Sequence, residues 1–177
     1  SVEEVLDEIR KRIEDLKREV DEVLDRSRRI IETLKERVDR VLKHSRELIK
    51  RLKDKLRELE EVKKTLDEII RKNEELVRDI RKELKRALDK NKELVKEIRR
   101  ELKEIIEEVK KLVDKGARDE EMKRALEEVK KLLDRLREEL KRSLDESRKL
   151  VEELERRLRE SNEESERLIR KLEREAD

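Results

Sequence analysis

The sequence predicts an all-α protein, an antiparallel up-down-up three-helix bundle of long, nearly straight helices. Charged residues make up 60% of the 177 residues, but the net charge is only +2, so the composition does not favour disorder. The chain has one Gly and no Pro, the two residues that most often interrupt helices. Leu, Ile and Val recur at helical spacing throughout, which is typical of long helices packed against one another.

The apolar positions repeat every 18 residues. Each predicted helix has its own series, shown by Leu6, Leu24 and Leu42, by Leu66, Leu84 and Leu102, and by Leu133, Val151 and Ile169. Eighteen residues are about five turns at 3.6 residues per turn. A heptad repeat would impose a left-handed supercoil, whereas this period predicts nearly straight helices.

The first helix is predicted to cover about residues 2–60, because Ser1-Val2-Glu3-Glu4 matches a capping box. A second capping box, Thr65-Leu66-Asp67-Glu68, predicts that the next helix begins near residue 65. We therefore expect a short turn near residues 60–64. That stretch holds no Gly, Pro or Asn, so one uninterrupted helix is the competing interpretation.

The second helix is predicted to end near residue 115 and the third to cover about residues 119–176. Gly116 suits a left-handed C-cap, and Asp119 suits the N-cap of the following helix. Acidic residues follow Asp119, as is common at helix N-termini. Together the three helices predict a single domain over residues 1–177.

Asn and Ser occupy positions where the apolar pattern calls for core side chains. In an antiparallel pair, residues at one level have numbers with a constant sum, and Ser27 with Asn91 and Ser45 with Asn73 both add up to 118. The third helix obeys the same rule, since Asn91 with Ser147 and Asn73 with Ser165 both add up to 238. The sequence thus places its polar core residues at two levels, about 27 Å apart at 1.5 Å per residue.

Each Asn is expected to be the centre of a buried hydrogen-bond network with Ser partners, because an unpartnered buried amide costs roughly 1–3 kcal/mol. Such networks fix the axial alignment of helices, since a slipped bundle leaves the amides unpaired. A tolerated polar residue at the core margin is the alternative for each position. The two predicted layers are Ser27, Asn91, Ser143 and Ser147, and Ser45, Asn73, Ser161, Asn162 and Ser165.

With its 18-residue repeat, its Asn/Ser layers, its capping boxes and its Glu, Lys, Arg and Asp surface, the chain resembles a family of de novo designed proteins. These are the untwisted three-helix bundles built from parametric backbones with buried hydrogen-bond networks. The resemblance covers the whole chain. It implies a structural scaffold of very high stability with no natural substrate.

No catalytic, cofactor-binding or metal-binding site is predicted, and we do not expect an enzyme. His44 is the only histidine, Cys is absent, and adjacent Ser45 cannot face His44 along one helix. His44 is expected at the boundary of the apolar stripe or beside the network. Gly116 has no neighbouring Gly with which to form a phosphate loop, and Met122 is expected to pack in the core near the second turn.

The sequence predicts no nucleic-acid or membrane partner. Basic residues alternate with acidic ones, aromatic residues are absent, and no apolar run exceeds two residues. The first residues do not resemble a signal peptide, so the localisation cannot be read. No partner is required, and we expect a monomer. The alternative is a self-association or partner-binding module that opens at residues 57–65, for example as a domain-swapped homodimer.

Overall fold

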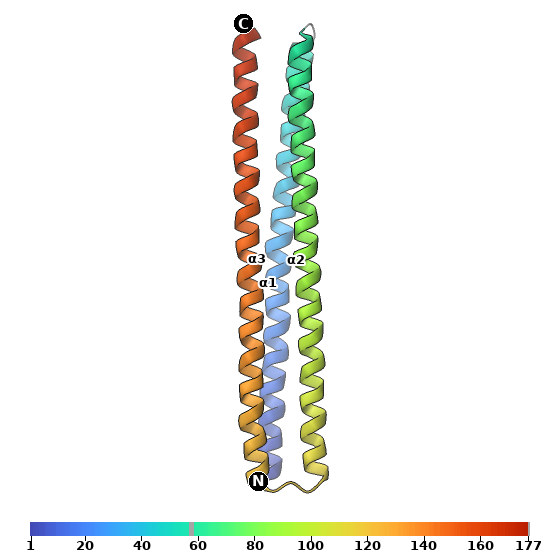
Figure 1. Ribbon diagram of the computed structural model, residues 1–177, viewed down its shortest axis with the longest axis vertical. Coiled ribbons are helices and arrows are strands. Elements are labelled where there is room, and N and C mark those ends of the chain that lie inside the picture. Colours follow the sequence, from blue (N-terminus) through green and yellow to red (C-terminus); the bar gives the residue numbers. More distant parts are fainter. Residues whose placement is uncertain (57–58, 177) are drawn as a thin grey trace. The chain divides into compact units, whose positions relative to one another are not determined.

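Three α-helices account for almost all of the chain in the computed structural model, which describes residues 1–56 and 59–176 (Figure 1). The helices are α1 (Val2–Lys55), α2 (Glu60–Asp114) and α3 (Asp119–Ala176). The described residues contain no β-strand. The prediction of an all-α, up-down-up three-helix bundle is confirmed.

The first helix begins with the predicted cap. The backbone N–H of Glu4 donates to the Oγ of Ser1 at 3.3 Å, and the N–H of Val5 donates to the Ser1 carbonyl at 3.2 Å. Ser1 is therefore the N-cap, which satisfies N–H groups that have no partner within the helix. Lys53 and Lys55 lie in the last turn of α1, where cations offset the helix dipole.

The boundaries of the first turn differ from the prediction. Helix α1 ends at Lys55 rather than near residue 60, and α2 begins at Glu60 rather than near residue 65. The carbonyl of Leu59 accepts the N–H of Lys63 at 3.2 Å, so Leu59 holds the N-cap position of α2. Leu59 lies outside both helices, and the alternative of one uninterrupted helix is wrong at this residue. Residues 57 and 58, which that alternative also includes, lie outside the described residues.

Thr65 is not a cap. It lies inside α2, where its hydroxyl donates to the carbonyl of Glu61, four residues earlier, at 3.1 Å. This bond is the local alternative open to Thr within a helix. The Thr65–Glu68 pattern resembled a capping box because spacing alone does not distinguish a first turn from a later one.

The turn between α2 and α3 is built on Gly116, as predicted. The φ angle of Gly116 is +77°, a left-handed conformation that costs an L side chain about 1–2 kcal/mol. The N–H of Gly116 donates to the Val113 carbonyl at 3.0 Å, and the N–H of Ala117 donates to the Leu112 carbonyl at 3.1 Å. This pair of bonds is the Schellman motif, and it satisfies two carbonyls at the end of α2.

Asp119 is the first residue of α3 and not its N-cap. The carbonyl of Arg118 accepts the N–H of Met122 at 3.0 Å, so Arg118 holds the N-cap position. Only Ala117 lies between Gly116 and Arg118, so the N-cap of α3 is one residue earlier than predicted. Asp119 still places a carboxylate in the first turn, where it is favoured by the helix dipole.

The chain divides into two compact units, which are described separately. Unit 1 comprises Ser1–Arg28 and Leu88–Ser147, and it takes a segment from each helix. Its core is a continuous apolar cluster, and its largest fully buried side chains include Ile9, Ile13, Leu16, Ile98, Leu102 and Met122. The predicted core position of Met122 is confirmed, since the side chain is fully buried.

Unit 2 comprises the described residues within Arg29–Ala87 and Arg148–Asp177, and it also takes a segment from each helix. Its largest fully buried side chains include Ile31, Leu34, Ile49, Leu66, Ile80 and Leu84. Each unit therefore has a core of its own. The single domain over residues 1–177 stays a prediction.

Ion pairs at the surface show the helix directions within each unit. In unit 1, Arg99 of α2 pairs with Asp21 of α1 at 2.6 Å, and in unit 2, Arg46 of α1 pairs with Glu74 of α2 at 3.0 Å. The two residue numbers of each pair add up to 120. In unit 2, Lys53 of α1 also pairs with Asp67 of α2 with the same sum, and in unit 1 the hydrogen bond between Ser27 and Asn91 has a sum of 118, so the α1 and α2 segments of each unit run antiparallel.

Pairs between α1 and α3 keep a constant difference instead. Arg137 pairs with Glu19 in unit 1 at 2.9 Å, and Arg37 pairs with Glu155 in unit 2 at 3.4 Å. Both pairs are 118 residues apart, and in unit 1 the N-terminal amine of Ser1 pairs with Asp119 at the same spacing, so the segments of α1 and α3 run parallel there. These side chains are partly exposed, so each pair contributes little, about 0–1 kcal/mol.

Candidate functional site

The most distinctive site of unit 1 is centred on the carboxamide of Asn91, on α2. Its Nδ2 donates to the Oγ of Ser27 on α1 and to the Oγ of Ser147 on α3, the latter at 3.0 Å. Its Oδ1 accepts from the Oγ of Ser143, also on α3, at 2.7 Å. One side chain thus uses both of its donor hydrogens and one of its acceptor positions to join all three helical segments.

Burial makes these bonds energetically important. Asn91, Ser27 and Ser147 are exposed by only 7%, 1% and 4%, and Ser143 is half-buried. A buried amide that loses its partners pays the full cost of its lost hydration, about 1–3 kcal/mol. The site is therefore stable only while the three segments keep this axial alignment.

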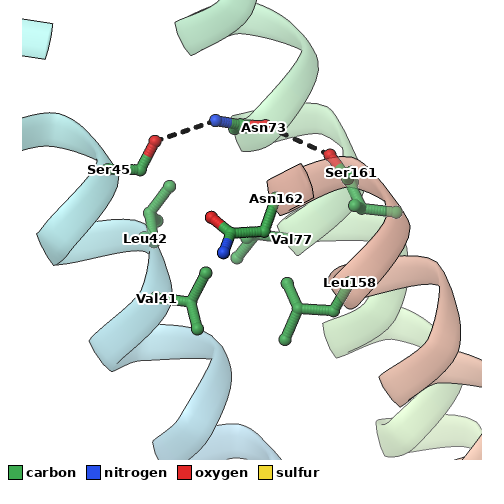
Figure 2. Close-up of a pocket in the computed structure, with 9 residues that line it drawn as sticks. Val41, Leu42, Ser45, Asn73, Val77, Leu158, Ser161 and Asn162 are labelled. Atoms are coloured by element: carbon green, nitrogen blue, oxygen red, sulfur yellow. Dashed lines mark hydrogen bonds between the residues drawn. The ribbon is translucent and has the colours of Figure 1, made fainter. Parts of the chain in front are cut away.

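Unit 2 holds a related site centred on Asn73, also on α2 (Figure 2). Its Nδ2 donates to the Oγ of Ser45 on α1 at 3.0 Å. Its Oδ1 accepts from the Oγ of Ser161 at 3.2 Å and from the Oγ of Ser165 at 3.3 Å, both on α3. Asn73 therefore also joins all three segments, but with one donor hydrogen and two accepted bonds.

The two sites differ in exposure and in completeness. Asn73 and Ser161 are half-buried, whereas Ser45 and Ser165 are buried. Asn162, which the sequence placed in this layer, lies beside the network and is half-buried. No hydrogen bond joins its side chain to another residue in the described part of the chain.

The 18-residue repeat relates the residues of the two sites one by one. Ser27, Asn91, Ser143 and Ser147 of unit 1 correspond to Ser45, Asn73, Ser161 and Ser165 of unit 2. The exception is Asn162, whose counterpart is Leu144, a buried apolar residue. A comparison of positions 144 and 162 in the sequence would have separated Asn162 from the other members of its layer.

The sequence analysis did not predict the ion pairs that join α1 and α3. The α1–α3 ion pairs at the corresponding positions have opposite polarity, with Glu19 facing Arg137 in unit 1 and Arg37 facing Glu155 in unit 2. The signal was available, because the sums of 118 and 238 imply that parallel residues of α1 and α3 differ by about 120.

His44 is exposed and makes no hydrogen bond to the Asn73 network within the described part of the chain. Across residues 1–56 and 59–176, no group of three or more His, Cys, Asp or Glu side chains is placed to hold a metal ion. No helix in the same residues is long and apolar enough to cross a membrane.

Chemically, the two sites consist of neutral amides and hydroxyls that bond to one another. Bonds between such groups are sensitive to the axial alignment of the helical segments, because each donor needs an acceptor at a defined position. In comparisons with known proteins, no family model, no curated protein and no solved structure matches this chain.

Proposed function

We propose that the protein is a structural scaffold, a designed helical bundle with no evolved biochemical activity, in which the Asn/Ser layers specify register and topology. Several independent features support this proposal. The Ser1 cap of α1, the Gly116 turn, the 18-residue repeat and the surface of mixed charges all favour the same arrangement of helices.

The observation that carries the proposal is the bonding of Asn91. Its amide contacts Ser side chains of α1 and α3 at once, within a core that is otherwise apolar. Sliding the α1 segment by a single turn would bring Val23 or Ile31 to the amide in place of Ser27 and leave one Nδ2 hydrogen unpaired. The network therefore penalises wrong alignments more than it stabilises the right one, as polar residues in coiled-coil cores do.

We further propose that the protein is a monomer that requires no partner. Within unit 1 and within unit 2, every buried side-chain nitrogen and oxygen atom of the described residues has a hydrogen-bond partner in the same chain. Self-association through a helix that runs on from α1 into α2 would require Leu59, which lies outside both helices in the single chain, to become helical.

Thermal unfolding followed by circular dichroism tests the scaffold proposal. We expect the helical signal to persist well above the usual range for mesophilic domains, about 45–65 °C. A cooperative transition below about 70 °C would count strongly against an idealised scaffold.

Light scattering across a dilution series tests the monomer separately. A mass near 21.7 kDa at every concentration is expected. A mass of twice that value would favour the domain-swapped dimer instead.

A further inference from the structure

A small, mainly apolar cavity with four polar residues in its lining adjoins the Asn73 network in unit 2. It has a volume of about 10 Å³ and is lined by segments of all three helices. Its apolar walls come from Val41, Leu42, Leu76, Val77 and Leu158, and its polar lining comes from Ser45, Asn73, Ser161 and Asn162. A volume of this size is about that needed for one water molecule, which also requires two to four polar partners.

The carboxamide of Asn162 has unused hydrogen-bonding capacity at this cavity. Figure 2 shows its amide among the apolar side chains, with no hydrogen bond drawn to it. An amide can donate two hydrogen bonds and accept two. Its polar atoms are not fully enclosed by protein, so water can reach them, and an occupant that both donates and accepts would use this capacity.

The other polar groups at the cavity have complementary capacity. Asn73 uses one of its two Nδ2 hydrogens, on Ser45, and Ser45 only accepts in that bond. Ser161 donates its hydroxyl hydrogen to Asn73 and keeps its oxygen lone pairs free. The lining thus offers donors at Asn73 and Ser45 and acceptors at Ser161 and Asn162.

We propose that this cavity is a binding site for a single ordered water molecule that joins Asn162 to the Asn73 network. The water accepts a hydrogen bond from Ser45 or from the second Nδ2 hydrogen of Asn73, and it donates to Oδ1 of Asn162. A buried water of this kind typically makes about three hydrogen bonds. Asn162 is then a member of its layer through water rather than by direct contact.

Water reaches the site without separation of the helices. A second, more open cavity of about 130 Å³ lies next to the first and shares Val41, Leu158 and Asn162 with it. Its remaining lining is charged and solvated, and consists of Arg37, Glu155 and Arg159. The side chain of Asn162 forms part of the wall between the two cavities, so a modest rotation of this side chain exchanges the water.

The repeat provides the control. Residues 41, 42, 45, 73, 76, 77, 158 and 161 of the cavity all have identical counterparts in unit 1, at 23, 24, 27, 91, 94, 95, 140 and 143. Only Asn162 differs, since its counterpart is Leu144. The amide at this one position is therefore the difference between the two networks that the variants exchange.

Crystal structures of the full chain and of two variants, at a resolution that shows ordered water, test the proposal. Asn162→Leu makes unit 2 match unit 1 at this position, and Leu144→Asn makes unit 1 match unit 2. In the unchanged protein we expect a water at hydrogen-bond distance, about 2.7–3.2 Å, from Asn162 and from at least one of Asn73, Ser45 and Ser161. That water should be absent from Asn162→Leu, and a new one should appear beside Asn91 in Leu144→Asn.

Three results would overturn the proposal: an empty cavity in the unchanged protein, a direct hydrogen bond from Asn162 to the network, or a water that persists in Asn162→Leu. Nuclear Overhauser transfer from water to the side-chain amide protons of Asn162 gives a second readout in solution. We expect it in the unchanged protein for both Asn162 and Asn73. The absence of this transfer at Asn162 would contradict the bridge. Transfer at Asn73 has a second source in a cavity of about 60 Å³ that Asn73 also lines, so the crystal structures decide at that residue.

Discussion

Replacement of Asn91 by Ala is the sharpest test of the energetic role assigned to the networks. The change removes three hydrogen bonds, to Ser27, Ser147 and Ser143. At a net 0.5–1.5 kcal/mol each, they amount to about 1.5–4.5 kcal/mol. The orphaned Ser hydroxyls can recover part of this by bonding to a carbonyl four residues earlier in their own helix. We therefore expect Asn91→Ala to lower the free energy of unfolding by about 2–4 kcal/mol.

The repeat supplies a matched control in Asn73→Ala, which also removes three hydrogen bonds. Asn73 and Ser161 are half-buried, so water can replace part of what is lost. We expect a cost of about 1–2 kcal/mol, smaller than for Asn91→Ala. Guanidinium denaturation followed by circular dichroism measures both, from the shift of the midpoint at constant m value.

A double-mutant cycle isolates one bond of the network. Combining Asn91→Ala with Ser147→Ala should give a coupling energy of about 1 kcal/mol, since the two side chains bond directly at 3.0 Å. The reasoning is refuted if Asn91→Ala costs less than about 0.5 kcal/mol, or if Asn73→Ala is the more damaging change.

Four further changes have defined outcomes by the same denaturation assay. Leu59→Ser should raise the free energy of unfolding by about 0.5–1 kcal/mol, because it places a hydroxyl at the N-cap of α2 and removes an exposed apolar side chain. A loss of stability would contradict the N-cap position assigned to Leu59. Gly116→Ala should lower the free energy of unfolding by about 1–2 kcal/mol. The cost comes from the positive φ alone, because an added Cβ meets no atom within 4 Å. An unchanged denaturation midpoint would contradict this reasoning. Ile80→Ala should cost about 2–5 kcal/mol, since Ile80 is fully buried, and a cost below about 1 kcal/mol would show that the core is loosely packed. Arg137→Ala should change stability by no more than about 1 kcal/mol, because its pairs with Glu19 and Asp134 are partly exposed, and a larger loss would require a role beyond these ion pairs.

Much of the fold follows from periodicity. The apolar spacing predicts three helices, and the constant sums predict which Ser side chains lie level with each Asn. That rule depends only on the rise per residue and the antiparallel direction, so it is insensitive to the detail of the turns. It brings Ser27 and Ser147 to Asn91, and Ser45 and Ser165 to Asn73.

The axial rule does not give rotation about the helix axis. Asn162 follows Ser161 in sequence and lies at nearly the same level, but one residue turns the helix by about 100°. Ser161 consequently bonds to Asn73, whereas Asn162 lines the cavity beside it. The unequal burial of Asn73 and Asn91 is a packing property that no spacing rule contains.

Helix ends were predicted less well than helix interiors, for a local reason. The residue at the start of α2 is Leu59, which has no side-chain oxygen and leaves no capping signature in the sequence. The pattern at Thr65 is a stronger capping signal in a place where the helix is already formed. At Gly116 the prediction was correct, because a left-handed residue is a steric requirement that Gly meets better than any other.

The central claim is that the amide of Asn91 bonds to Ser side chains of two other helices in the same chain. Isotope-filtered nuclear Overhauser spectroscopy on a mixture of labelled and unlabelled protein tests it most directly. We predict contacts from the side-chain amide protons of Asn91 to the β protons of Ser27 and Ser147, all within one chain. The absence of these contacts, or their appearance only between labelled and unlabelled chains, would contradict the claim.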